Sequence, residues 1–423
     1  MTGSPGWLND GMRHVWLPYS QMKLADPPLP VVATEGTRIH LADGRVLIDG
    51  IASWWTACHG YNHPHLRQAL AQQAARMPHV MFGGLSHEPA LTLAKRLAEV
   101  LPGDLERVFF AESGSVAVEV AMKMAIQYWL NKGERGRTKL LSFTGGYHGD
   151  TIATMAVCDP DEGMHALFTG LLPEHHVRPL PRDGESLADL EAFLESRGGE
   201  IAAILVEPLV QGAGGMVLHD ASVLRTLRDL ADRYGILLIF DEIFTGFGRT
   251  GTMFACQAAG VVPDIVTLSK ALTGGTLPLS ATVARRHVFD AFWSDDPQAA
   301  LMHGPTYMGN ALACAVANAS LDLFETEPRL AQVAAINGWL KTGLEPCRDL
   351  PGVRDVRTLG AIGVVQMDRI NNLTGLKRLL VAEGVWVRPF RDILYLTPAF
   401  TASQEDVMHL TGAITRVLQR SVP

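Results

Sequence analysis

Two short apolar runs that each stop at a charged residue constrain the fold of this chain most strongly. Residues 237–242 read Leu-Leu-Ile-Phe-Asp-Glu, and residues 264–270 read Asp-Ile-Val-Thr-Leu-Ser-Lys. An uninterrupted apolar run of this length, with turn signals on either side, indicates a strand buried on both faces of a parallel sheet. Ligands of open α/β sheets bind at the carboxyl ends of such strands. We therefore expect Asp241 and Lys270 to face one crevice from neighbouring strand ends.

A carboxylate and an amine in one crevice suit the chemistry of pyridoxal phosphate. A lysine can hold the aldehyde of that cofactor as a Schiff base, and an aspartate can keep its pyridine nitrogen protonated. A charge at a strand end is more often simply the place where the chain meets water. Of the eight lysines, however, Lys270 alone follows an apolar strand run. The pair therefore raises a cofactor hypothesis without settling it.

Composition limits the classes of protein that need to be considered. With 423 residues the chain can bury a large core and form two or three domains. The net charge of −8 does not favour binding to nucleic acid or to an anionic membrane. No apolar run is long enough to span a bilayer, and the N-terminus lacks the pattern of a secretory signal. The five cysteines are scattered and never form a Cys-x-x-Cys pair, so we expect a cytoplasmic protein without a disulfide framework or a metal site.

Turn signals and the spacing of apolar residues predict an α/β domain and a smaller α+β domain. Asp43-Gly44 between two alternating runs predicts a hairpin near residues 37–49. Strands that alternate with helices over about residues 105–285 predict a mostly parallel sheet flanked by helices. A helix over about residues 329–344, followed by two strands and a closing helix, predicts the smaller domain. The expected bounds are 1–51 and 327–423 for the two parts of the small domain and 52–326 for the large domain.

A Ser-Gly-Ser turn precedes a helix expected over residues 116–130. Ser113, Gly114 and Ser115 would offer free backbone N–H groups at the positive end of that helix, which makes a phosphate site. The signal is weak by itself, because serine is also a common helix cap. Since the chain has neither a Walker loop nor a Gly-x-Gly-x-x-Gly motif there, nucleotides are poorly supported as ligands. Tyr147 follows another strand and could lie flat on a planar cofactor.

Two further stretches combine aromatic and cationic side chains. Trp54 and Trp55 lie in a turn-rich segment that we expect to be a loop, where they either fill a domain interface or line a pocket. Arg388 lies among apolar and ring side chains. It is either a surface arginine whose stem covers apolar surface or a guanidinium that grips a carboxylate.

Taken together, these motifs resemble those of the class III aminotransferases of pyridoxal-phosphate fold type I. The motifs that carry the resemblance are Phe240-Asp241-Glu242, Leu268-Ser269-Lys270 and Gly304-Pro305-Thr306. Within the family, the chain is similar to the branch that aminates 8-amino-7-oxononanoate in biotin synthesis. The stretches that carry this narrower likeness include Trp16-Leu17-Pro18-Tyr19, Ser53-Trp54-Trp55 and Trp386-Val387-Arg388-Pro389-Phe390.

The resemblance implies a role for each of several residues toward the cofactor. Lys270 would carry the Schiff base and then move the proton during transfer. Asp241 would pair with the pyridine nitrogen. Gly114 and Ser115 would hold the phosphate, and Tyr147 would stack on the ring.

The resemblance also implies a homodimer with shared active sites. Pro305 and Thr306 match the turn that reaches the phosphate bound by the partner subunit. Arg388 would meet the carboxylate of the keto acid. The full set of implied substrate contacts is Tyr19, Trp54, Tyr147, Lys270, Gly304 and Arg388. Positions of lower rank in the implied site are Asp150, Glu207 and Arg249.

The activity implied by the resemblance is a ping-pong aminotransfer. S-adenosylmethionine would give up its amino group, and 8-amino-7-oxononanoate would take it up and become 7,8-diaminononanoate. Three alternatives stay open: another class III ω-aminotransferase, a diaminononanoate synthase that uses lysine as donor, and a cofactor-binding regulatory protein without turnover. The sequence departs from the family pattern at Phe400, where a tyrosine is expected, so any contact from that hydroxyl is missing.

Overall fold

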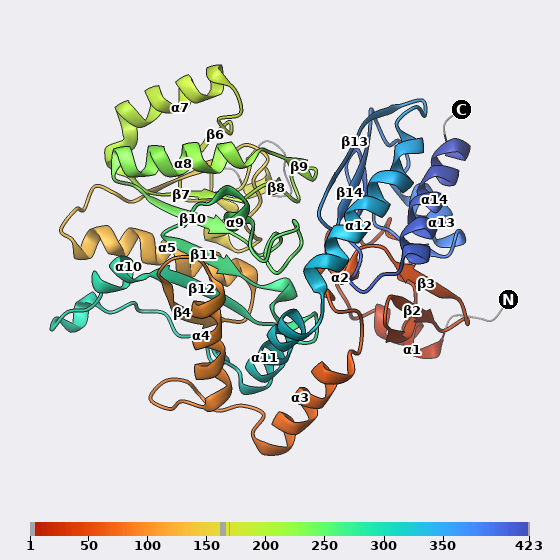
Figure 1. Cartoon of the computed structure of the whole chain (residues 1–423), viewed down its shortest axis with the longest axis horizontal. Helices are drawn as coiled ribbons and strands as arrows, with labels where there is room; N and C mark the ends of the chain where they lie inside the picture. Colours follow the sequence, from red (N-terminus) through yellow and green to blue (C-terminus); the bar gives the residue numbers. More distant parts are fainter. Residues whose placement is uncertain (1–4, 161–165, 169, 422–423) are drawn as a thin grey trace. The chain divides into compact units, whose positions relative to one another are not determined.

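The computed structural model describes residues 5–160, 166–168 and 170–421. The chain divides into two compact units, which Figure 1 colours by sequence position. The first unit holds residues 1–63 and 335–423, and the second holds residues 64–334. The domain bounds expected from the sequence stay a prediction.

The second unit is built on a seven-stranded sheet with the order β4-β12-β11-β10-β7-β5-β6 (Figure 1). Its strands are β4 (Leu105–Ala111), β5 (Lys139–Phe143), β6 (His176–Arg178), β7 (Ile201–Val206), β10 (Leu237–Asp241), β11 (Ile265–Leu268) and β12 (Ser280–Arg285). β12 runs antiparallel to both of its neighbours, and the other adjacent strands are parallel. The predicted fold class, a mostly parallel sheet flanked by helices with a smaller α+β part, is confirmed. β10 and β11 are hydrogen-bonded neighbours, and Asp241 pairs with Thr267.

Helices of this unit pack on the sheet and on one another. The longer ones are α3 (Pro64–Arg76), α4 (Glu88–Val100), α5 (Gly114–Asn131), α7 (Gly184–Arg197), α8 (Ala221–Tyr234) and α11 (Ala311–Thr326). α5 is rich in small apolar residues, and its Val118 and Ala121 share one buried cluster with Leu237 and Ile239 of β10. Since successive strand residues point to opposite faces, Phe240 faces away from this cluster. Both faces of β10 are therefore apolar, as its uninterrupted run predicts.

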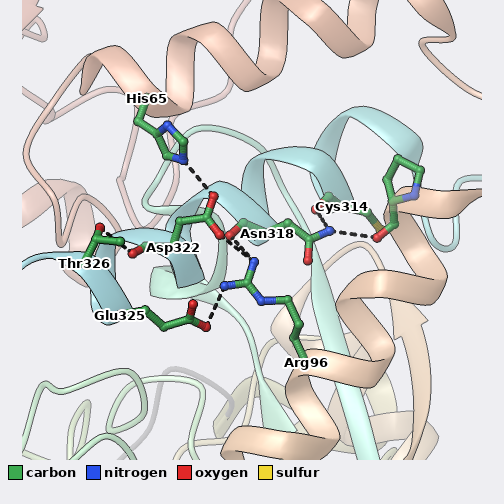
Figure 2. A network of polar contacts seen from close by, with 8 residues as sticks. His65, Arg96, Cys314, Asn318, Asp322, Glu325 and Thr326 are labelled. Atoms are coloured by element: carbon green, nitrogen blue, oxygen red, sulfur yellow. Dashed lines mark hydrogen bonds and ion pairs between the residues drawn. The ribbon is translucent and has the colours of Figure 1, made fainter.

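A polar network joins α3, α4 and α11, and Figure 2 shows its side chains. Arg96 of α4 donates to Asp322 and to Glu325 of α11, both at 2.7 Å. His65 of α3 lies 2.7 Å from the second carboxylate oxygen of Asp322. The Arg96 side chain is 17% exposed, but those of Asp322 and Glu325 are 41% and 59% exposed, so solvent reaches these ion pairs. The network fixes the helix that follows the Gly304-Pro305-Thr306 turn.

The first unit contains two small sheets. One has the order β1-β2-β3-β15 and the other β13-β14-β16. The strands are β1 (Val31–Glu35), β2 (Arg38–Leu41), β3 (Val46–Asp49), β13 (Val353–Leu359), β14 (Ile362–Met367), β15 (Val385–Trp386) and β16 (Ile393–Leu396). The hairpin predicted at Asp43-Gly44 is confirmed: β2 and β3 are antiparallel, and Gly44 has a φ of 89°. β15 pairs parallel with β3, so both ends of the chain contribute to one sheet.

Helices complete the first unit. The helices are α1 (Gly6–Met12), α2 (Ala52–Trp55), α13 (Leu373–Ala382), α14 (Gln404–Ser421) and most of α12 (Arg329–Leu344).

Three local features differ from what the sequence predicts. The tryptophan segment expected as a loop contains the helical turn α2. β13 was not predicted, because its charged and apolar residues show no clean alternation. In the second unit, α5 begins at Gly114 rather than near residue 116, because Ser113 caps it by accepting from the Val116 N–H at 3.4 Å.

Two classes of feature are absent from the described part of the chain. No helix among the described residues is long and apolar enough to cross a bilayer. The same residues contain no group of three or more His, Cys, Asp or Glu that could hold a metal ion. The five cysteines are buried.

Glu242 links the end of β10 to the short helix α9 (Ala255–Ala259). Its side chain is fully buried, with 0% of its surface exposed. Its two oxygens accept from the backbone N–H groups of Ala255 at 2.7 Å and Cys256 at 2.8 Å. Burial raises the pKa of Glu242 to about 7, above its usual value of 4.5. Between about pH 4.5 and about pH 7, the folded protein therefore keeps the Glu242 proton that the unfolded chain releases.

This pKa predicts how the stability of the protein depends on pH. Because the folded state binds the extra proton, the contribution of Glu242 to the free energy of unfolding is present below about pH 4.5 and is lost as pH rises toward about 7. Gln at this position does not titrate. From about pH 5 to about pH 8, we expect wild type to lose on the order of 3 kcal/mol more than Glu242→Gln, measured by denaturant unfolding.

The exposed Glu88 in the first turn of α4 offers a matched control. Glu88→Gln should follow the pH profile of wild type. A Glu242→Gln variant that keeps the wild-type profile would show that Glu242 titrates normally in the folded protein.

Candidate active site

The centre of the candidate site is the carboxylate of Asp241 at the end of β10. The residue is 4% exposed. One of its oxygens, Oδ2, lies 2.8 Å from Nδ1 of His148. The other, Oδ1, accepts from the Thr267 hydroxyl at 3.1 Å and from the Ile243 N–H at 3.2 Å. Since both oxygens have partners, the orientation of the carboxylate is fixed.

His148 comes from the segment that follows β5. Its backbone N–H donates to the sulfur of Cys158 at 3.2 Å. The next residue, Gly149, has a φ of 128°, and a Cβ atom there would collide with Ser115. The hydroxyl of Ser115 also accepts from the Asp150 N–H at 3.3 Å. Glycine at residue 149 therefore lets this segment lie against the first turn of α5.

Glu207, at the end of β7, supports the same segment from another side. Its carboxylate accepts from the backbone N–H groups of Tyr147 and Gly212, both at 3.0 Å. Burial raises the pKa of Glu207 to about 7; nearby His148 opposes this shift and Asp241 adds to it. The hydroxyl of Tyr147 donates to Asp150 at 2.9 Å. Both the backbone and the ring of Tyr147 are thus held in place.

Lys270 lies just beyond β11 in a left-handed backbone conformation with a φ of 41°. Such strain in a residue other than glycine costs on the order of 1–3 kcal/mol and is concentrated at functional sites. Burial lowers the pKa of its amine. The carboxylates of Asp241, Glu207 and Asp150 oppose that shift. The structure thus brings Lys270 into the electrostatic neighbourhood of Asp241, as the sequence predicts.

The first turn of α5 approaches the end of β10 closely. Gly114 and Ser115 are its first two residues, and the N–H groups of a first helical turn have no partner within their helix. A Cβ atom on Gly114 would come within 3.0 Å of the Ile243 side chain, two residues beyond Asp241. Glycine therefore allows the positive end of α5 to lie beside the Asp241 segment.

The Gly304-Pro305-Thr306 turn lies before α11, and Gly304 and Thr306 are exposed. Nearby residues fasten it: Lys123 donates to the Met302 carbonyl at 2.8 Å, and Asn310 donates to the Pro78 carbonyl at 3.3 Å. These bonds lead to α5 and to the segment after α3, and neither reaches Asp241 or Lys270. These two hydrogen bonds therefore do not connect the Gly304-Pro305-Thr306 turn to the Asp241 carboxylate of the same chain.

Three predicted substrate contacts form one cluster within the first unit. The guanidinium carbon of Arg388 lies 4.3 Å from the centroid of the Trp54 ring. The Tyr19 ring meets the same indole edge-on, with 6.2 Å between centroids. Burial lowers the pKa of Arg388, and Tyr19 is 53% exposed. A stacked guanidinium thus lies beside a phenol that is open to solvent.

Trp54 is presented by α2, which is a left-handed helical turn. The φ angles of Ala52, Ser53, Trp54 and Trp55 are 44°, 46°, 56° and 75°. Residues other than glycine cost roughly 1–2 kcal/mol each in this conformation. The Trp55 N–H donates to the Ile51 carbonyl at 2.8 Å, which closes the turn. Four such residues in a row are unusual and need support from outside the turn.

The structure also locates the remaining residues that the sequence analysis singled out. Glu207 and Asp150 both contact Tyr147, as described above. Arg249 is buried in the second unit, in the segment that follows β10. Phe400 is buried in the first unit, where its N–H donates to the Cys58 carbonyl at 2.8 Å. A ring without a hydroxyl is therefore accommodated at residue 400 in an apolar place.

Sequence reasoning missed two partners of Asp241, namely His148 and Thr267. Neither residue type by itself signals a contact with a particular carboxylate. Thr267 could have been found from the pairing of β10 with β11, which sets it opposite Asp241. His148 had no such signal, because the segment after β5 is irregular.

The chain is similar to known proteins over nearly its whole length. The family model described as aminotransferase class-III matches residues 19–418. A relative from Mycobacterium leprae (strain TN), adenosylmethionine-8-amino-7-oxononanoate aminotransferase, is 46% identical and is covered over 94% of its length by 96% of this chain. The structure of a protein of that name from Methanocaldococcus jannaschii has a TM-score of 0.93 at 29% identity, with 97% of this chain and 98% of that chain covered. An amine transaminase from an uncultivated Pseudomonas species, in a PLP-bound form, gives a TM-score of 0.90 at 31% identity over 96% and 98% of the two chains.

The His148–Asp241 pair predicts a specific cost of mutation. His148→Phe keeps a flat ring but leaves the buried Asp241 carboxylate without one of its donors. A buried hydrogen bond to a charged group is worth roughly 1.5–3 kcal/mol. We therefore expect the free energy of unfolding of the cofactor-free protein to fall by about this amount, measured by denaturant titration.

A second histidine–carboxylate pair in the same unit provides the control. His176 lies 2.9 Å from Glu200, and both are only half-buried. His176→Phe should cost less than about 1 kcal/mol, because solvent can satisfy Glu200. Equal losses for the two variants would contradict a special role for the buried pair.

Proposed function

Because the chain belongs to the class III aminotransferase family, we propose that it transfers an amino group from S-adenosylmethionine to 8-amino-7-oxononanoate. The product would be 7,8-diaminononanoate, an intermediate of biotin synthesis. The observation that carries the reaction class is the fixed, buried Asp241 carboxylate near the Lys270 amine, whose pKa is lowered. The choice of substrates is supported by the relatives that bear this name over nearly the whole chain.

The residues fit pyridoxal phosphate as the cofactor, and a PLP-bound transaminase of the same fold supports the assignment. When bound, this group supplies an aldehyde that takes up an amine and a ring that withdraws electrons. Asp241 would hold a proton on the pyridine nitrogen, with His148 and Thr267 keeping its carboxylate in orientation. Gly114 and Ser115 would hold the phosphate, because the first turn of α5 offers N–H groups and a positive dipole end.

Lys270 would anchor the aldehyde and later carry the proton that transamination moves. A protonated amine is not a base, so burial, by lowering the pKa of Lys270, increases the fraction that can accept this proton near neutral pH. Asp241 and Glu207 limit how far that pKa falls. Tyr147, held by Glu207 and Asp150, would present its ring to the face of the cofactor.

Arg388 would recognise the carboxylate at the far end of the keto acid. Its guanidinium is stacked on Trp54, which leaves the donor edges of the fork available for a planar carboxylate. Burial around the group strengthens such a charge-assisted pair. Tyr19 and Trp54 would line the same pocket, and Gly304 would contribute from the exposed turn.

A second candidate function is that of an ω-aminotransferase acting on another amine. The likeness to the amine transaminase, with a TM-score of 0.90, supports this second candidate. A diaminononanoate synthase that takes its amino group from lysine is a narrower alternative. The three differ in the donor and acceptor they use, so one set of assays separates them.

The proposed function predicts activity with one defined pair of substrates. Purified protein with pyridoxal phosphate should convert 8-amino-7-oxononanoate into 7,8-diaminononanoate when S-adenosylmethionine is the donor, followed by mass spectrometry. Lys270→Ala should remove turnover while the protein stays folded. Conversion with lysine instead would assign the lysine-using branch. Failure of the keto acid with every donor, while simple amines and aldehydes react, would assign the ω-aminotransferase.

Loss of the Arg388 guanidinium should weaken the acceptor half-reaction selectively. Arg388→Ala leaves the carboxylate of the keto acid buried and unpaired, which costs roughly 2–5 kcal/mol. Arg388→Lys keeps the charge but cannot form the fork, so it should recover only part of the loss. Single-turnover rates of the two half-reactions provide the measurement. An unchanged acceptor rate in folded Arg388→Ala would remove this residue from the site.

The exposed turn supports a homodimer in which Thr306 serves the phosphate site of the other subunit. Inactive Lys270→Ala and Thr306→Ala proteins, unfolded and refolded together, should then regain activity. In a mixed dimer both lesions fall in one site, and the second site is intact. With random pairing we expect about a quarter of wild-type activity.

A mixture of Lys270→Ala with Asp241→Asn is the matched control. Both of these residues belong to the same chain's site, so no mixed dimer has an intact site. Its activity should stay at the mean of the two parents. A Thr306→Ala mixture that behaves in the same way, despite proven subunit exchange, would argue for a site built from one chain.

A further inference from the structure

A second buried carboxylate, that of Asp49, lies at the end of β3 in the first unit. It is 2% exposed. Its Oδ1 accepts from the Ile51 N–H at 2.9 Å, and its Oδ2 accepts from the Ser53 N–H at 2.8 Å. The hydroxyl of Tyr61 donates to the same Oδ2 at 2.5 Å. Asp49 therefore holds the chain on both sides of Ala52, where the left-handed turn begins.

The left-handed turn α2 needs this support. Its four residues have side chains that disfavour positive φ, so nothing in their own preference selects the conformation. The N–H groups of Ile51 and Ser53 point at one carboxylate because the turn has this hand. Tyr61 reinforces the arrangement, since its hydroxyl also lies 2.5 Å from the Ser53 hydroxyl. Burial raises the pKa of Asp49, while these donors favour its ionised form.

The same strand pair carries both Asp49 and Arg388. β3 pairs with β15, and Asp49 stands opposite Trp386 in the register. The Gly50 N–H donates to the Trp386 carbonyl at 2.9 Å. Arg388 lies two residues after Trp386, so the strand pairing fixes the position of its backbone relative to Asp49. The turn held by Asp49 carries Trp54, and the centroid of the Trp54 ring lies 4.3 Å from the guanidinium carbon.

We propose that Asp49 is the positioning residue that keeps Trp54 stacked on Arg388 and so shapes the pocket for the substrate's carboxylate. Asp49 does not touch substrate; it acts through α2. This inference rests on the proposed function for the identity of the ligand. Its structural half, that Asp49 orders the Trp54 ring, can be tested without any substrate.

The first experiment measures the order of the Trp54 ring by near-ultraviolet circular dichroism of the holoenzyme. The difference between wild type and Trp54→Phe gives the signal of that one indole. The same difference is then measured in the Asp49→Asn background, where asparagine cannot accept from both N–H groups and from Tyr61. We expect the signal to fall to less than about a third. An unchanged signal would overturn the proposal.

The second experiment separates positioning from a general loss of structure. Asp49→Asn should raise KM for 8-amino-7-oxononanoate about tenfold, as the loss of a buried charge-assisted hydrogen bond predicts. The donor half-reaction should change less than about twofold. Asp43→Asn is the control, because the exposed Asp43 makes two hydrogen bonds to Arg45 in the neighbouring hairpin turn. Equal losses in both half-reactions would overturn the proposal.

Rescue by glycine tests whether backbone strain is the link. Ser53→Gly in the Asp49→Asn background can adopt the φ of 46° without steric cost. It should restore at least half of the lost Trp54 signal and of the change in KM. Ser53→Ala removes the same hydroxyl but keeps the steric cost, so it should restore neither. Rescue by alanine as well as glycine would contradict the role of strain.

A milder variant covers the case in which Asp49→Asn does not fold. Tyr61→Phe keeps the carboxylate and removes one donor, so the Trp54 signal should weaken and KM should rise about threefold. No change in either would overturn the proposal. If wild type itself does not use 8-amino-7-oxononanoate, the proposed function fails, whereas the dichroism experiments still decide the role of Asp49.

Discussion

The second unit depends on one constraint, the buried carboxylate of Asp241. This residue ends β10, a strand that is buried on both faces. A buried charge without partners is strongly destabilising, by several kcal/mol. Each element that comes near it therefore supplies a donor: the segment after β5 supplies His148, and β11 supplies Thr267. The close approach of α5 to the adjoining segment in turn requires glycine at residue 114. The geometry proposed to bind the cofactor follows from satisfying this one carboxylate.

The first unit uses the same device for a different purpose. Asp49 is also a buried carboxylate at a strand end, and its donors are two backbone N–H groups and one phenol. In both units a strained backbone lies close by: Lys270 beside Asp241, and α2 beside Asp49. Strain of this kind persists only where the surroundings over-determine the conformation. Around α2 the surroundings are the Asp49 carboxylate, which accepts from the Ile51 and Ser53 N–H groups, and the strand that carries it.

The two buried carboxylates also differ in what they can do chemically. Asp241 lies in a neighbourhood of titratable groups that includes Glu207 and the Lys270 amine, so its charge influences protonation there. Asp49 is surrounded by neutral donors and fixes shape. The proposed site thus contains one carboxylate that acts on protonation and one that fixes shape.

The sequence by itself determined the fold class, the hairpin at Asp43-Gly44 and the neighbouring strands β10 and β11, whose ends carry Asp241 and Lys270. These features depend on local patterns: an apolar run that ends in a charge, or a turn residue between alternating runs, has few other structural solutions. Only the tertiary structure decided which side chains hold Asp241, because His148 belongs to an irregular segment far away in sequence. Only the tertiary structure gave α2 its left hand, because that conformation opposes the preference of every residue in it and exists through hydrogen bonds to Asp49. Local preference predicts structure where it agrees with the fold, and the residues proposed to shape the site are those where long-range contacts override it.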